Sequence, residues 1–191
     1  DARAGDVPGA AGIARLRRLH ADVPLGGSGV LIAQPRVYAF TTTSPGLLHV
    51  LRSECRVSRA WKPELGGVEP PSVAFTAIWD TGAARSVISE NVVRACGLAQ
   101  TGMARVQGVH GPATVETYFV NVALPNSITV AGIRATKGAL LSGDDVLIGM
   151  DVISIGDFAV TNYDGSTMFS FRSPSMGHID FVAEAEGDET E

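Results

Sequence analysis

Apolar and polar residues alternate along much of the chain beyond residue 50, and this two-residue period predicts β-strands. In the stretch SVAFTAIW, which ends at Trp79, both alternating faces are apolar. A strand of this kind is expected in the interior of a sheet, with a neighbour on each side. The run YFVNVAL, residues 118–124, has two distinct faces and predicts another strand.

Turn and helix-cap residues divide the rest of the chain. The stretch SENVVRACGL predicts a short helix, with Ser89 as its N-cap and Gly97 as a left-handed residue after its end. Two extended runs on either side of residues 108–111 predict a long hairpin. Nearer the C-terminus we expect a buried strand at 146–148, then a turn or short helix, then a hairpin that reverses near residues 164–165.

About seven short strands, glycine-rich turns and one or two short helices predict an all-β fold, either a closed barrel or a sandwich. Residues 1–45 are rich in Gly, Ala, Pro and Arg and are expected to form a flexible N-terminal extension. Residues 46–174 are expected to fold as one domain. Residues 175–191 become acidic and are expected to form a solvated C-terminal tail.

Composition excludes several classes of partner. The formal net charge is −5 and the basic residues are mostly scattered, so no nucleic acid partner is expected. No apolar run reaches the roughly 18 to 20 residues that span a bilayer, so no membrane contact is expected. The N-terminal residues lack the order of a secretory signal. A cytoplasmic location is the default expectation, although the chain begins with Asp1 and a leader could be missing.

Cysteine and histidine residues give no metal pattern. Cys55 and Cys96 lack the spacing of metal ligands, and both are expected to be reduced, with Cys96 buried. His20, His49 and His178 are far apart in the sequence. We therefore assign neither a metal nor a cofactor.

The run Asp80-Thr81-Gly82-Ala83 directly follows the strand that ends at Trp79. An ionised carboxylate at the end of a buried strand is costly unless hydrogen-bond donors or cations satisfy it. One interpretation is an ordinary turn, because Asp and Gly favour turns. The other is that Asp80 is a catalytic carboxylate.

The wider pattern resembles the retropepsin-like aspartic proteases, and within them the bacterial single-domain members. The residues Ser86, Val87 and Ile88 supply the small hydroxyl and aliphatic positions that usually follow the motif in that family. Further along, Leu147-Ile148-Gly149 is similar to the family's second signature, which packs beneath the catalytic loop. The run IGMDVISIGDFAVTN is similar to the family's closing turn, short helix and interface strand.

The resemblance implies a role for each motif residue. Asp80 would be the catalytic residue, Thr81 would hydrogen-bond to a second copy, Gly82 would allow a close backbone turn and Ala83 would keep the wall beside the substrate small. The family's flap hairpin corresponds to residues Gly108, Val109, His110 and Gly111. This flap would close over an extended peptide. For His110 the more common interpretation is an exposed turn residue.

A homodimer follows from the mechanism that the resemblance implies. Two carboxylates share one proton, one activating a water and the other donating to the scissile carbonyl. The chain carries one Asp-Thr-Gly run and is too short for a two-lobed enzyme, so the second aspartate must come from a second copy. We therefore expect a homodimeric aspartic endopeptidase. The alternative is a dimerisation or peptide-binding module with little or no proteolytic activity.

Other candidate sites are weaker. Asp144, Asp145 and Asp151 suggest a cation site, but a solvated turn and a capping aspartate are the more common explanation. Ser154 lacks the glycine setting of a nucleophile elbow. Phosphate transfer of the D-x-D kind is excluded because Gly82 occupies its third position. Trp79 stands where viral members usually carry a smaller aliphatic residue, so viral specificity does not carry over, and the substrate is left open.

Overall fold

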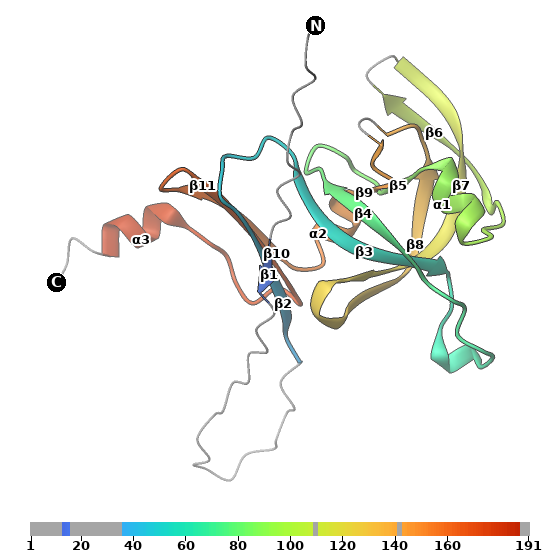
Figure 1. Cartoon of the computed structure of the whole chain (residues 1–191), viewed down its shortest axis with the longest axis horizontal. Helices are drawn as coiled ribbons and strands as arrows, with labels where there is room; N and C mark the ends of the chain where they lie inside the picture. Colours follow the sequence, from blue (N-terminus) through green and yellow to red (C-terminus); the bar gives the residue numbers. More distant parts are fainter. Residues whose placement is uncertain (1–12, 16–35, 109–110, 141–142, 188–191) are drawn as a thin grey trace, which may run out of the picture.

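The computed structural model describes residues 13–15, 36–108, 111–140 and 143–187. Most of these residues belong to β-strands, with three short α-helices and two 3-10 turns (Figure 1). The strands are β1 (Ile13–Arg15), β2 (Tyr38–Ser44), β3 (Leu51–Arg59), β4 (Val73–Trp79), β5 (Val87–Ile88), β6 (Gly102–Gly108), β7 (Gly111–Leu124), β8 (Ile128–Lys137), β9 (Val146–Ile148), β10 (Asp157–Tyr163) and β11 (Ser166–Ser173). The helical segments are η1 (Pro63–Leu65), α1 (Glu90–Ala95), η2 (Pro125–Ser127), α2 (Met150–Ile153) and α3 (Phe181–Gly187).

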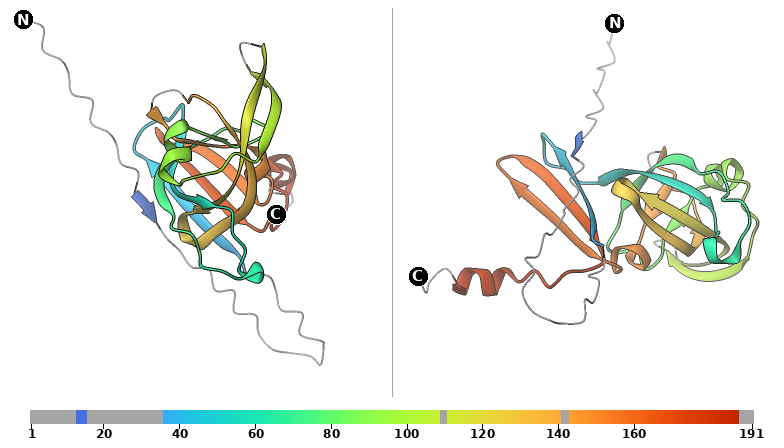
Figure 2. Two further views of the ribbon diagram at one scale, coloured as in Figure 1. Left: turned by 90° about the vertical axis from the view of Figure 1, so that its right-hand side faces the viewer. Right: turned by 90° about the horizontal axis from the view of Figure 1, so that it is seen from below.

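Six strands close into a barrel. They are hydrogen-bonded in the order β3-β4-β9-β5-β8-β7, and β7 also pairs with β3, which completes the ring. The closing register sets Val57 opposite Val122, and both side chains are buried. Strand β6 lies outside the ring and pairs only with β7, so the two form a long hairpin that rises from the barrel (Figures 1 and 2). The expected all-β barrel is confirmed.

Alternation of side chains explains how β4 and β7 build the core. On β4, Ala77 and Trp79 are buried, whereas Ala74 and Thr76 on the other face are exposed. The strand is central as predicted, since β3 and β9 flank it, but only one of its faces is buried. On β7 the buried residues recur at every second position, from Tyr118 through Leu124.

A second sheet, in the order β1-β2-β11-β10, stands beside the barrel (Figure 2). Strand β2 pairs along its whole length with β11, and Phe40 at its centre is 2% exposed. The expected boundary at residue 45 therefore falls after β2 rather than before it, and residues 38–44 are not a flexible extension. Strand β1, in the same expected extension, pairs with β2. Residues 1–12 and 16–35 lie outside the described residues.

One expectation about cysteine burial is corrected, and the C-terminal tail contains a helix that was not expected. Cys55 is the buried cysteine, whereas Cys96 is only partly buried, and both are free thiols. Burial raises the pKa of the Cys55 thiol to about 12. The predicted acidic tail contains α3, whose first amides are capped by Asp180 and whose Phe181 is exposed. Residues 188–191 lie outside the described residues.

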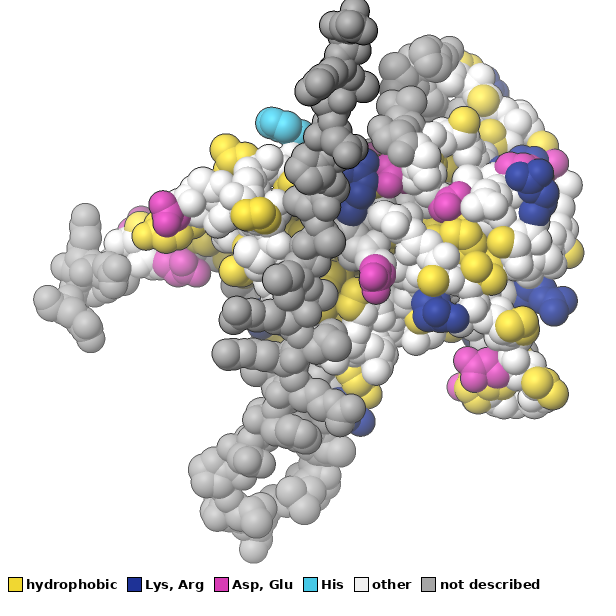
Figure 3. All heavy atoms as spheres, viewed as in Figure 1, with side chains coloured by type: hydrophobic (Ala, Val, Ile, Leu, Met, Phe, Trp, Pro, Cys, Tyr) yellow, Lys and Arg dark blue, Asp and Glu magenta, His cyan; other side chains and the backbone are white. Residues whose placement is uncertain are grey.

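Surface charge is mixed on the face drawn in Figure 3, where Lys and Arg side chains lie in separate groups between acidic ones. Among the described residues, no helix is long and apolar enough to cross a membrane.

Candidate active site

The Asp80 loop, residues 80–85, leaves the barrel at the end of β4. Strand β9 runs parallel to β4, and the amide of Asp80 continues this pairing by donating to the Ile148 carbonyl at 3.0 Å. The Asp80 carboxylate is half-buried, and its Oδ1 accepts from the Gly82 amide at 2.8 Å. This hydrogen bond within the loop fixes the orientation of the Asp80 carboxylate.

Gly149 lies directly beneath the Asp80 loop. A Cβ atom at this position would come within 2.6 Å of the Arg85 carbonyl carbon and 2.9 Å of the Ala83 oxygen. The next amide, of Met150, donates to that same Ala83 oxygen at 2.8 Å. Only a glycine allows the two backbones to approach this closely. The segment Leu147-Ile148-Gly149 thus lies under the loop, with Ile148 buried and Leu147 partly buried.

Ser86 and Asp151 join the loop to helix α2. The Asp151 carboxylate accepts from the Ser86 amide at 2.9 Å and from its hydroxyl at 2.7 Å. The Ser86 hydroxyl oxygen in turn accepts from the Gly149 amide at 3.1 Å. The expected role of Asp151 as a helix cap is wrong, because Gly149 occupies the N-cap and makes no side-chain cap.

The sequence motifs do not predict this contact. Ser86 is expected only as a small hydroxyl residue after the motif, and Asp151 only as one of three neighbouring acids or as a helix cap. The signal that links them is the position of Asp151 two residues after Gly149, which brings its side chain back to the loop that Gly149 supports.

The remaining motif residues lie at the loop's surface. Thr81 and Gly82 are exposed and Ala83 is partly buried. Within the described part of the chain, the Thr81 hydroxyl makes no hydrogen bond. The expected contact of Thr81 is with a second copy, so a single chain leaves this prediction open.

The predicted hairpin is formed by β6 and β7, which pair from Gly102–Thr117 up to Gly108–Gly111. The positive φ of Gly111, 104°, suits a glycine at the reversal. The tip residues Val109 and His110 lie outside the described residues.

The base of this hairpin is fixed by charged groups. Lys137 at the end of β8 forms ion pairs with Glu116 on β7 and with Glu90 at the start of α1. The Tyr118 hydroxyl also donates to Glu116, and these donors, Lys137 first, lower the pKa of the Glu116 carboxyl. The hairpin is therefore anchored to the barrel at its lower end.

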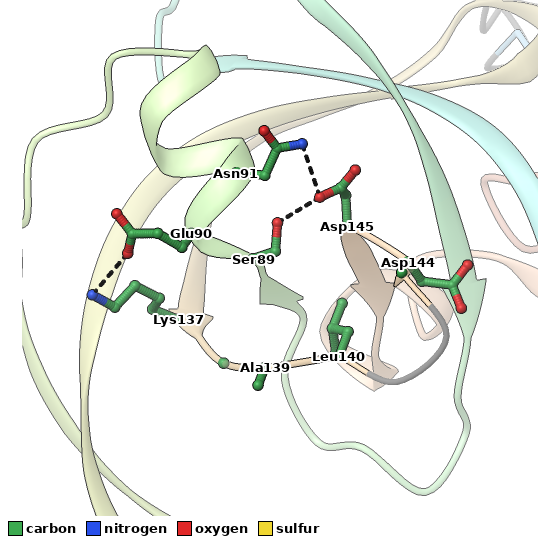
Figure 4. Close-up of a pocket in the computed structure, with 10 residues that line it drawn as sticks. Ser89, Glu90, Asn91, Lys137, Ala139, Leu140, Asp144 and Asp145 are labelled. Atoms are coloured by element: carbon green, nitrogen blue, oxygen red, sulfur yellow. Dashed lines mark hydrogen bonds and ion pairs between the residues drawn. The ribbon is translucent and has the colours of Figure 1, made fainter.

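An open pocket lies between the start of α1 and the segments that follow β8 and precede β9 (Figure 4). Asp145 faces it and accepts from the Ser89 hydroxyl at 2.6 Å and from Asn91 at 3.1 Å. Asp144 is not in a solvated turn as expected: it is 9% exposed and bonded by two oxygens to Arg52, each at 2.9 Å. Among the described residues no three His, Cys, Asp or Glu side chains gather as a metal site.

Part of the chain that contains this site matches a known protein family. Residues 71–155 match the family model described as "gag-polyprotein putative aspartyl protease". A comparison with curated proteins found no match.

Two solved structures are similar at low identity. One is the foamy viral protease-reverse transcriptase in complex with an RNA/DNA hybrid, 18% identical with a TM-score of 0.39, covering 55% of this chain and 12% of that one. The present chain therefore spans only a small part of the viral polypeptide. The other is a retropepsin-like aspartic protease from Rickettsia conorii, 15% identical with a TM-score of 0.36, covering 66% of this chain and 98% of that one.

The family match runs from just before β4 to the end of α2 and includes both signatures. It thus covers Asp80 with its loop, Gly149 beneath the loop, and the hairpin of β6 and β7. Residues 71–155 are thus similar to the aspartyl proteases of gag polyproteins.

Proposed function

We propose that the protein is an aspartic endopeptidase that acts as a homodimer, with Asp80 as the catalytic residue of each copy. The proposal rests on how the loop holds the Asp80 carboxylate. Its carboxylate is half-buried and oriented by the Gly82 amide, while Gly149 supports the loop backbone from below. This arrangement suits a group that must be held still yet reach a substrate.

The chemistry needs two such carboxylates. When two carboxyl groups lie close together, one proton is retained between them, because two adjacent like charges are unfavourable. The ionised member takes a proton from a water, which attacks the scissile carbonyl, and the protonated member donates to that carbonyl oxygen. With one Asp-Thr-Gly run per chain, two copies supply the pair across a two-fold axis.

An extended peptide or protein is the substrate class that fits this proposal. The hairpin of β6 and β7 would cover it, with Gly108 and Gly111 allowing the tip to move and water to be excluded. The main chain of the peptide would bond to strand edges, and its alternate side chains would enter pockets.

Cleavage of a peptide library, measured from acid to neutral pH, tests the proposal. We expect the native chain to cleave and the Asp80→Asn chain to lose activity by at least about 1,000-fold, because Asn can neither ionise nor share the proton. Asp164→Asn is the matched control, since Asp164 lies in the β10–β11 turn at φ 49°, a conformation that Asn also adopts. Binding of peptides without any cleavage that depends on Asp80 would instead favour a dimerisation or peptide-binding module.

A further inference from the structure

We propose that Trp79 is a positioning residue for Asp80, and that through Trp79 the sheet of β1, β2, β11 and β10 orients the Asp80 loop. Trp79 is the last residue of β4, so its main chain is bonded directly to Asp80. The catalytic part of this inference rests on the proposed function. Its structural part stands on the contacts of the indole ring.

Four phenylalanine rings from the second sheet surround the Trp79 indole. Phe158 on β10 stacks on it with ring centres 5.3 Å apart and an interplanar angle of 4°. Phe171 and Phe169 on β11 lie at 5.2 and 5.9 Å, and Phe40 on β2 lies at 5.9 Å. The side chain that ends the catalytic strand of the barrel is therefore packed into the other sheet.

A hydrogen bond fixes the ring from the barrel side. The indole Nε1 donates to the Ser53 hydroxyl at 3.0 Å, and both residues are buried. Ser53 lies on β3 opposite Ala77, one strand away. A ring that is stacked, enclosed and hydrogen-bonded has one rotamer available to it, and its main chain cannot shift without breaking those contacts.

The position of Asp80 follows from that constraint. The indole ring fixes the chain on one side, and the hydrogen bond from the Asp80 amide to the Ile148 carbonyl fixes it on the other. Together they limit the directions in which the main chain can enter the Asp80 loop. Reacting groups misplaced by about 1 Å can lose about 100-fold in rate. All four phenylalanines lie outside the matched segment 71–155, so the flanking strands contribute to the site as well.

Substitution of Trp79 by Leu and by Phe tests the role in catalysis. For folded Trp79→Leu protein we expect kcat for peptide cleavage to fall about 10-fold to 100-fold while KM changes far less, because the lost contact aligns Asp80 rather than binds peptide. Trp79→Phe keeps ring packing and should retain an intermediate kcat. Trp61→Leu is the matched control, because that indole donates to Gly66 in a separate surface loop.

Hydrogen exchange gives a second readout that needs no activity. In Trp79→Leu we expect faster exchange at the Gly82 and Ala83 amides, which bond to Asp80, with unchanged exchange in the β6–β7 hairpin. If the native chain cleaves no peptide, the proposed function is wrong. The hydrogen-exchange measurement then tests by itself whether Trp79 orients the Asp80 loop. A native kcat in folded Trp79→Leu, or exchange that rises equally throughout the barrel, would overturn the inference.

Discussion

Gly149 leaves no room for a larger side chain beneath the Asp80 loop. In Gly149→Ala the new methyl group would meet backbone atoms of Arg85 and Ala83 at 2.6 to 2.9 Å, and backbone cannot move aside as a flexible side chain can. We expect the free energy of unfolding to fall by about 1–3 kcal/mol. Urea denaturation measures it, with Gly46→Ala as control because a Cβ there meets nothing within 4 Å. Equal losses in both variants would contradict the role of Gly149.

Asp157 makes stability depend on pH in the acid range. The Met176 amide, the Ser175 hydroxyl and Arg172 lower the pKa of its carboxyl from 3.8 to about 2. Because the folded-state pKa is the lower one, these bonds stabilise the fold above about pH 4, and this stability is lost as pH falls towards about 2.

The difference in unfolding free energy between the native chain and Asp157→Asn should therefore be largest at neutral pH. We expect it to shrink between about pH 4 and pH 2, as the native carboxyl takes up its proton. Urea denaturation across that range measures the difference. If the difference were the same at pH 3 and pH 7, Asp157 would not be the titrating group.

Strand β2 determines where the folded domain begins. A chain that starts at residue 46 lacks Phe40, which packs on Trp79, Phe169 and Phe171, and it exposes the edge of β11. Compared with a chain that starts at residue 36, we expect a loss of about 3–5 kcal/mol in unfolding free energy, the usual cost of removing a buried phenylalanine. Matching urea midpoints for the two chains would instead support a domain boundary at residue 45.

Elements with local signals were predictable from the sequence. The α1 helix has its Ser89 cap and a left-handed Gly97, and the C-terminal hairpin turns at residues 164–165, because these signals lie within a few residues of the structure that they specify. The contact of Ser86 with Asp151 spans 65 residues, and that of Arg52 with Asp144 spans 92. A local pattern can mark one member of such a pair but not both, since the barrel must close before they meet.

The proposed sharing of one active site by two copies predicts how mixed copies behave. If one catalytic unit needs Asp80 from two chains, then a native chain paired with an Asp80→Asn chain is inactive. With free exchange of copies, the activity per native chain should fall to about one half at equal amounts and to about one tenth in a ninefold excess of the variant, as random pairing requires. A ninefold excess of Asp164→Asn chains serves as the control, because these copies retain Asp80. Activity that stays proportional to native chain alone would mean that each copy works without a partner.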